Sequence, residues 1–330
     1  MKVEIHDRLE AVGSGAWDEL VAACRLRSPF LTWTWQRQWV HAFAEGCRLE
    51  IRAVKDPADR LVALLPLYEV EPGLLRLVGG ADVSDYLDLI AVDGREEQAW
   101  TALLQARAAD RARWRLHAVP AASPTVTALP ALAAACALQA SSTVEERCPV
   151  LALPDSWDAY LETLSGKHRH EIKRKLRRFE REQPQARVTQ VSAPDDIAAR
   201  LGDFLALHRL SRVGKAKFMD ARMEAFFRAA LPALAAGGAA RLWLLETGQG
   251  PIASFICLEW DGGVGLYNSG FDPGCAALSP GLVLLTHVIR DAMARGCRRF
   301  DFLRGEERYK YEFGPTPEDV HCVEIGPVPS

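Results

Sequence analysis

The chain lacks the short motifs that mark many enzyme classes. None of its eight cysteines lies within eleven residues of another, so it has no CxxC zinc or redox motif. It also has no HExxH, GxSxG, Walker A or GxGxxG segment, which excludes the commonest metalloprotease, hydrolase, nucleotide and dinucleotide sites. We therefore expect no metal, and we interpret the cysteines as small core thiols of a reducing compartment.

Long apolar runs are also missing. The first fifteen residues contain no apolar stretch of the kind found in signal peptides. The longest such run, Ala128 to Leu138, contains a proline and is far shorter than the ~20 residues that a membrane-spanning helix needs. The sequence predicts a cytoplasmic protein without a membrane span.

Lysine is scarce. The chain has 8 lysines against 32 arginines and a net charge of −3, so a globally basic nucleic-acid coater is excluded. The imbalance is typical of a GC-rich genome, and it makes each lysine worth attention. With 330 residues, 49% of them hydrophobic, we expect a globular protein of two domains, at 1–148 and 149–330.

The pattern of apolar residues predicts helices and strands in a repeated order. The second half is read as strand, two helices, three consecutive strands, a loop, a helix and a strand, and the first half has a similar order. Runs of antiparallel strands packed by helices are typical of α+β proteins. Two similar halves indicate a duplicated domain.

A loop and helix start at 272–281 is the first candidate site. Ser279 suits an N-cap, a proline follows it, and Gly281 leaves the backbone open. Unpaired N–H groups at a helix start favour a phosphate, although every helix needs a start.

The segment 300–314 is the second candidate. It places Asp301, Arg304, Tyr309 and Lys310 just after a predicted core strand, where catalytic groups often lie. Lys310 is the only lysine after Lys217, which hints that a compact point charge is wanted. A solvated charged helix is the alternative.

A basic helix at 167–181 carries eight Lys or Arg against two Glu. One face is apolar and the rest is basic. This face can be merely solvated, can form a groove for a polyanion, or can rest on an acidic membrane surface. The loop before it places Lys167 where it could reach into a cleft.

Two further features lie in the first half. Asp85 and Tyr86 stand at a predicted strand start, where the carboxylate can serve as a base or bind an amine, or be solvated. Trp35 and its neighbouring tryptophans have the spacing of a core helix face, and a ligand-binding wall is the less favoured interpretation.

These pieces occur together, in the same order, in one known family. The chain resembles the CelD-like branch of the GNAT acyltransferase superfamily, related to the FemAB aminoacyltransferases. The resemblance covers residues 25 to 315 and rests on SPFLTWTWQRQWV (28–40), SDYLD (84–88), LSGKHRHEIKRKLRR (164–178), LYNSGFDPG (266–274), LSPGLVLLTHVI (278–289) and FDFLRGEERYK (300–310). It implies tandem GNAT-like domains with mixed, mostly antiparallel sheets flanked by helices.

The resemblance also implies acyl transfer to an amine, with acyl-CoA as co-substrate and no tightly bound cofactor. Lys310, Tyr309 and Asp85 would then be catalytic. Substrate contacts would come from Tyr86, Tyr267, Asn268, Arg304, Asp301 and Trp35, and the donor would rest on Ser279, Gly281, Leu282 and Lys167. The loop 274–281 lacks the closely spaced glycines of ordinary acyl-CoA sites.

Three functions therefore stay open. The first is an N-acyltransferase that uses an acyl-CoA or another thioester on a small amine or amino sugar. The second is a Fem-like transferase that takes an aminoacyl group from tRNA. The third is a catalytically silent binding module of a polysaccharide or cell-envelope system.

Overall fold

The protein divides into two compact units. The structure, a computed structural model, describes residues 1–107, 112–211 and 213–328. Unit 1 comprises Met1–Arg147 and Glu318–Ser330, and unit 2 comprises Cys148–Pro317. The predicted boundary at 148/149 lies beside the first division. The segment from Glu318 on belongs to unit 1 and not to the second domain, because its strand pairs with a strand of unit 1.

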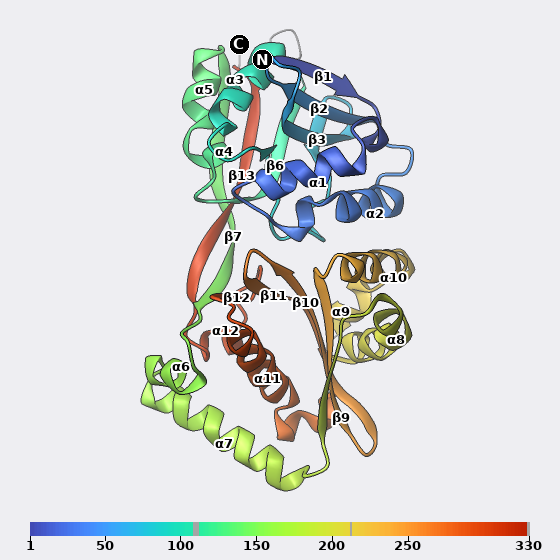
Figure 1. The fold of residues 1–330 in the computed structure, drawn as a ribbon, viewed down its shortest axis with the longest axis vertical. Coiled ribbons are helices and arrows are strands. Elements are labelled where there is room, and N and C mark those ends of the chain that lie inside the picture. Colours follow the sequence, from blue (N-terminus) through green and yellow to red (C-terminus); the bar gives the residue numbers. More distant parts are fainter. Residues whose placement is uncertain (108–111, 212, 329–330) are drawn as a thin grey trace. The chain divides into compact units, whose positions relative to one another are not determined.

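Unit 1 is built around a mixed sheet (Figure 1). Its strands are β1 (Lys2–His6), β2 (Leu49–Lys55), β3 (Leu61–Glu71), β4 (Leu74–Leu77), β5 (Ile90–Ala91), β6 (Arg113–Pro120), most of β7 (Leu138–Ala152) and most of β13 (Thr316–Pro327). Its helices are α1 (Ser14–Ala23), α2 (Trp33–Phe43), α3 (Glu96–Ala106), α4 (Pro124–Thr127) and α5 (Leu129–Ala135). The sheet order is β1-β2-β3-β4-β6-β13-β7, and β5 pairs with β3.

Local chemistry explains the turns and caps of unit 1. The β2–β3 hairpin closes on Asp56, whose carboxylate accepts hydrogen bonds from the N–H groups of Ala58 and Arg60. Helix α2 begins at Thr32, whose hydroxyl accepts from the N–H of Trp35.

Unit 2 repeats the same kinds of element. Its strands are the end of β7, then β8 (Arg187–Val191), β9 (Ala240–Thr247), β10 (Gly250–Trp260), β11 (Gly263–Phe271) and β12 (Arg299–Asp301). Its helices are α6 (Trp157–Thr163), α7 (Gly166–Glu182), α8 (Pro194–Ser211), α9 (Val213–Phe218), α10 (Ala221–Ala236), α11 (Pro280–Ala294) and α12 (Arg308–Tyr311). The sheet order is β7-β12-β11-β10-β9-β8.

The two units share one topology. In unit 1 the strands β1 to β4 pair antiparallel in succession, and β4 then pairs in parallel with β6 after the crossover through α3. In unit 2 the strands β8 to β11 pair antiparallel in succession, and β11 pairs in parallel with β12 after α11. The duplication that the sequence predicts is therefore present in the strand order.

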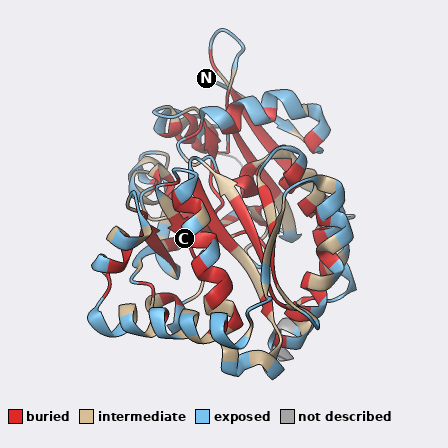
Figure 2. Cartoon of the chain, turned by 60° about the horizontal axis from the view of Figure 1, so that its bottom comes forward, coloured by how far each residue is buried: buried red, intermediate tan, exposed pale blue. Residues whose placement is uncertain are grey.

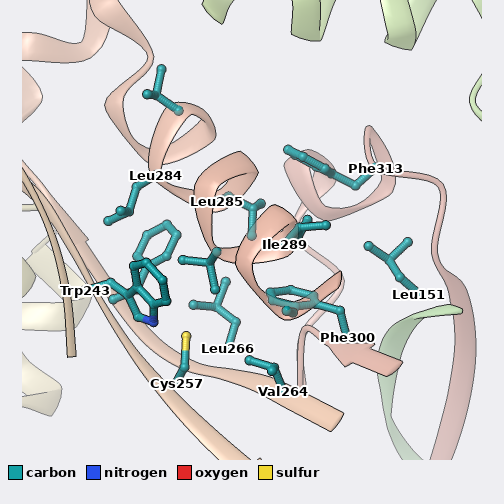
Figure 3. Close-up of a cluster of buried hydrophobic side chains, with 14 of the residues drawn as sticks. Leu151, Trp243, Cys257, Val264, Leu266, Leu284, Leu285, Ile289, Phe300 and Phe313 are labelled. Atoms are coloured by element: carbon teal, nitrogen blue, oxygen red, sulfur yellow. The ribbon is translucent and has the colours of Figure 1, made fainter. Parts of the chain in front are cut away.

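Helices cover both faces of the unit 2 sheet. Helix α11 lies on one face, where Leu284 and Leu285 join Trp243, Cys257 and Phe300 in a buried apolar cluster (Figure 3). Helices α8 and α10 cover the other face (Figure 1). Alternate strand residues serve the two layers, which is the period-two pattern of a sheet buried on both sides.

The distribution of burial follows this layering. Within each unit the strands carry mostly buried residues, and the outer sides of the helices are exposed (Figure 2). In the part of the chain that the structure describes, no helix combines the length and the apolar content needed to cross a membrane.

Some elements differ from the sequence predictions. The Ala-rich composition of 126–138 favours a single helix, but the chain forms two short helices there, α4 and α5. The apolar spacing of 95–112 also favours one helix, whereas α3 ends at Ala106 and part of the remainder lies outside the described residues. Strands β1, β7 and β13 were not predicted. Much of β7 is polar and exposed, so its own pattern shows no core face.

Candidate active site

Strands β11 and β12 of unit 2 are paired only at the start of β11 and then diverge. They pair in parallel over three positions, and the last pair is Gly265 with Asp301. Strand β12 ends there, whereas β11 continues to Phe271. The second half of β11 therefore has no β12 partner along one edge.

A β-bulge lies in the half of β11 that extends beyond β12. Leu266 pairs with Cys257 and Asn268 pairs with Ile256, so Tyr267 is an extra residue on β11. The Tyr267 ring stacks on Phe227 of α10, with 5.7 Å between ring centroids. Tyr267 and Asn268 are half-buried.

Helix α8 holds the end of β11 in place, which sequence reasoning missed. Gly270 lies so close to α8 that a Cβ there would approach the backbone nitrogen of His208 to 2.4 Å. The Ser211 hydroxyl accepts a hydrogen bond from the N–H of Phe271 at 2.8 Å. A glycine inside a strand was the available signal, because it often marks close backbone approach.

The start of α11 follows directly. Ser279 occupies the N-cap position, but its side chain makes no capping hydrogen bond, because its backbone is left-handed with φ +53° rather than extended. The predicted side-chain cap is therefore wrong. The space above Gly281 is open, since a Cβ there would meet no atom within 4 Å. Leu282 packs partly against the apolar cluster. The first N–H groups of α11 lie at the positive end of its dipole.

The loop after β12 is organised by two buried charged residues. Asp301 is 1% exposed, and its carboxylate accepts from the N–H of Leu303 at 2.8 Å and from the guanidinium of Arg299 at 3.0 Å. Leu303 itself is left-handed, with φ +55°. Asp301 therefore holds a strained turn, which gives it a positioning role.

Lys310 is the second of these residues and is 3% exposed. Its ammonium donates to the carbonyls of Arg304 and Gly305, both at 2.9 Å, and lies 2.8 Å from Oε2 of Glu307. A longer contact of 3.4 Å reaches the Leu303 carbonyl. An ammonium has three N–H donors, so these partners account for all of them. Lys310 thus fastens the loop 303–307 to α12.

Tyr309 and Arg304 lie at the surface of the same loop. Tyr309 is 37% exposed, and its ring meets Phe302 edge to face at 6.5 Å. Arg304 is partly exposed. These two side chains, unlike Lys310, can meet a ligand without rearrangement of the loop.

The predicted residues of the first half lie in unit 1. Trp35 is fully buried and its indole N–H donates to the Ser84 hydroxyl at 2.8 Å, which leaves no surface for the predicted ligand contact. Tyr86 is 4% exposed, and Asp85 is partly exposed.

The matching gap of unit 1 is occupied by its own chain. Strands β4 and β6 stop pairing at Arg76 and Arg115, and the segment 83–91 then folds back, with the N–H of Leu87 bonded to the Ala118 carbonyl at 3.0 Å. The two copies of the fold therefore differ at the place where a ligand could enter.

Helix α7 carries the basic segment. Ser165 caps it by accepting from the N–H of His168, and Lys167 is exposed in its first turn. A shallow groove of about 400 Å³ runs along the helix and is lined by His170, Arg174, Arg177, Arg178 and Arg181. Glu171 and Glu182 pair with some of these arginines. The predicted basic face is thus present and partly neutralised.

Comparison with known families decides the class of unit 2. Residues 166–311 match the family model described as an acetyltransferase (GNAT) domain. Unit 2 therefore contains a match to the GNAT domain family and has the GNAT fold. The GNAT strand order recurs in unit 1, and the predicted α+β fold with tandem GNAT-like domains is confirmed.

Solved structures share this fold over the whole chain. FemX is similar with a TM-score of 0.68 and 12% identity, covering 98% of this chain and 97% of its own. A conserved protein of unknown function from Bacteroides thetaiotaomicron VPI-5482 has a TM-score of 0.63 and 12% identity, covering 98% and 100%. L-PGS from Bacillus licheniformis has a TM-score of 0.55 and 11% identity, covering 83% of each chain. No curated protein matches the chain. At these identities the likeness establishes the fold.

Proposed function

We propose that the protein is an N-acyltransferase that moves an acyl group from an acyl-CoA or another acyl-thioester to the amine of a small molecule or amino sugar. The observation that carries the proposal is the divergence of β11 from β12 in unit 2. Strand β11 continues beyond its last pair with β12 and has a bulge at Tyr267, and it lies in the same domain as the open start of α11.

Several groups in this region of β11 and α11 would act in the reaction. A thioester is already activated, so the protein must orient the amine, take up its proton and stabilise the oxyanion that develops on the carbonyl. Backbone N–H groups of β11 beyond Gly265 supply donors for the oxyanion. Gly281 and Leu282 at the start of α11 receive a donor phosphate. Tyr309 is placed to contact the substrate or give a proton.

Four other predicted residues have no direct place in this region of β11 and α11. Arg304 meets an anionic group of the donor, and Lys167 can do so from the start of α7. Asp85 lies in unit 1, and its role toward an amine stays a prediction. Lys310 acts on the reaction through the loop that it holds. Its predicted neutralisation of a phosphate would require the ammonium to leave a carbonyl partner.

A charge placed at the helix start tests the donor site. Gly281→Glu puts a carboxylate where the phosphate would rest, in space that is open. The fold should persist, because acidic residues are favoured in the first turn of a helix. Gly202→Glu on α8, also in open space, is the matched control.

The readout is ligand-induced stabilisation. A ligand present at a hundred times its Kd stabilises the native state by about 2.7 kcal/mol. CoA, acetyl-CoA and longer acyl-CoAs should raise the melting temperature of the wild type and of Gly202→Glu, and Gly281→Glu should respond much less. If no CoA compound shifts the wild type, or if both variants respond equally, the proposed donor site is abandoned.

The groove on α7 favours a second candidate, a Fem-like transferase that uses aminoacyl-tRNA. Arg174, Arg177 and Arg181 present guanidinium groups to solvent along one groove, and phosphodiesters are bound by such groups. Retention of tRNA should then weaken steeply with salt. Replacing Arg177 by Ala should lower the slope of log affinity against log salt by about 1.

The two candidates give opposite results in these assays. Stabilisation by acyl-CoA without salt-dependent tRNA retention supports the thioester donor, and the reverse supports tRNA. If neither donor binds and no amine is acylated, the silent binding module becomes the better description.

A further inference from the structure

A pocket of about 220 Å³ lies in unit 1, and the reaction proposed for unit 2 does not use it. It is lined by residues of β4, β6, β13 and β7, which are neighbours in the sheet in that order. Pockets that hold drug-sized ligands are larger, at about 300–1,000 Å³. The pocket therefore has the size for a small metabolite.

Alternate residues of three strands place polar groups on one face of the sheet. They are Arg113 and Arg115 of β6, Glu324 and Gly326 of β13, and Gln139 and Ser141 of β7. Successive side chains of a strand point to opposite faces, so each pair shares a face. The ring of Trp114, between the two arginines, contacts the guanidinium groups of Arg52 and Arg107, which are both buried. The pocket thus lies on the face opposite to this buried layer.

Three polar side chains of the pocket have no partner in the part of the chain that the structure describes. They are the guanidinium of Arg113, the amide of Gln139 and the hydroxyl of Ser141. All three residues are exposed, so their hydrogen bonds go to water or to a ligand. The stem of Arg113 lies on Gly326, where a Cβ would come within 3.3 Å of its Cγ. A glycine at 326 therefore leaves Arg113 its place beside the pocket.

An ion pair adds a carboxylate to the same face. Arg115 and Glu324 are direct register partners of β6 and β13, and Nε of Arg115 donates to Oε1 of Glu324 at 2.6 Å. Within the described residues the other oxygen, Oε2, accepts no hydrogen bond, so it can accept from a ligand. Arg113 lies two residues from Arg115 on β6. A ligand that reaches both Arg113 and Glu324 must carry a negative and a positive group close together.

We infer that this pocket binds a free α-amino acid, with the carboxylate on Arg113 and the ammonium on Oε2 of Glu324. The planar fork of a guanidinium matches a carboxylate in a bidentate geometry. The amide of Gln139 and the hydroxyl of Ser141 are further donors for the carboxylate.

The rest of the lining agrees with this class of ligand. Leu74, Ile325 and Pro327 supply apolar surface for the amino-acid side chain. An inorganic phosphate would instead meet the carboxylate of Glu324, and like charges placed together oppose binding.

Titration calorimetry of the wild-type protein with each of the twenty free amino acids is the first test. At least one should bind, with one molecule per chain. Its analogue without the amino group and its analogue without the carboxylate should each bind at least about tenfold more weakly, because each loses a charged hydrogen bond. The inference is overturned if no amino acid binds, even if inorganic phosphate does, or if either analogue binds as tightly as the amino acid.

Arg113→Gln is the second test, and Arg8→Gln, at another exposed arginine of unit 1, is its control. Arg113→Gln should weaken binding of the amino acid at least about tenfold, whereas Arg8→Gln should bind it like the wild type. Both positions are exposed, so both variants should fold, and urea unfolding checks this. Equal affinities of Arg113→Gln and the wild type would overturn the inference.

Glu324→Gln separates the two ends of the ligand. It should weaken binding of the amino acid at least about tenfold, because the ammonium loses its carboxylate. It should not weaken the analogue without the amino group, because the freed Arg115 adds an attraction for a carboxylate. Any other pattern would overturn the inference. If Glu324→Gln fails to fold, the analogues and Arg113→Gln decide.

The result is independent of the function proposed for unit 2. Acyl transfer to an amine should continue in Arg113→Gln, and binding of the amino acid should persist in Gly281→Glu. An amino acid that binds only as a substrate of unit 2 would bind Arg113→Gln like the wild type. That result would overturn the inference and leave the proposed function standing.

Discussion

Replacing Lys310 by methionine tests whether this lysine holds the loop or acts on the substrate. Methionine has a similar length and no charge, so it fills the space without the ammonium. The substitution leaves the partly buried carbonyls of Arg304 and Gly305 without their 2.9 Å donor. It also removes the partner of Glu307, a carboxylate whose side chain is 45% exposed.

The size of the effect follows from these contacts. A hydrogen bond to a charged group contributes about 1.5–3 kcal/mol to the free energy of unfolding. The exposed Glu307 pair adds at most about 1 kcal/mol. Rehydration of the freed carbonyls offsets part of the loss of two such bonds, so we expect Lys310→Met to lower the free energy of unfolding by about 3 kcal/mol.

Urea unfolding measures the global effect, and amide hydrogen exchange measures the local one. The urea midpoint of Lys310→Met should fall, and the amides of residues 303–311 should exchange faster. Lys167→Met removes an exposed lysine on α7 and serves as the control that should unfold like the wild type.

Wild-type stability of Lys310→Met would refute the reasoning. If the variant unfolds at the wild-type urea concentration and its loop amides keep their protection, the lysine does not hold the loop. If such a stable variant loses turnover, the ammonium acts on the substrate, as the sequence resemblance implied. Loss of stability together with loss of turnover supports the positioning role.

Three other features predict measurable effects. The pKa of His117 is raised to about 9, so its protonated form stabilises the native state below about pH 6.5. That contribution is lost as pH rises through about 9, and urea midpoints should decline over this range more in the wild type than in Glu145→Gln. Tyr160→Phe removes a 2.7 Å hydrogen bond to the buried Phe313 carbonyl and should cost about 1–2 kcal/mol in urea unfolding; an unchanged midpoint would contradict this. Burial raises the pKa of Asp88 to about 6, so the contribution of Asp88 to stability declines as pH rises from about 4 to above 6; the stability of the wild type relative to Asp88→Asn should fall over this range, and parallel profiles would count against it.

Strand β11 and helix α11 of unit 2 show which parts of the candidate site can be predicted from sequence. The strand 263–271 and the helix after it were predictable, because apolar periodicity and the Ser-Pro-Gly start are local signals. The bulge at Tyr267 was not, because it is defined by the register against β10. Nor was the role of Ser211, which depends on how α8 crosses β11.

The contact between His117 of β6 and Glu145 of β7 shows the limit more sharply. Nothing in the sequence connects these residues, since they lie far apart along the chain. They meet because β13 inserts between β6 and β7 in one sheet. Non-local strand pairing of this kind leaves no short-range pattern.

The sequence by itself determined the fold class, the repeated order of helices and strands, and the basic helix α7, because these depend on local periodicity and charge. Only the tertiary structure decided what Lys310 does. Its ammonium is buried against carbonyls of residues 304 and 305, and such a contact depends on the path of a loop. The tertiary structure alone also returned the last strand to unit 1, because β13 finds its hydrogen-bond partners in β6.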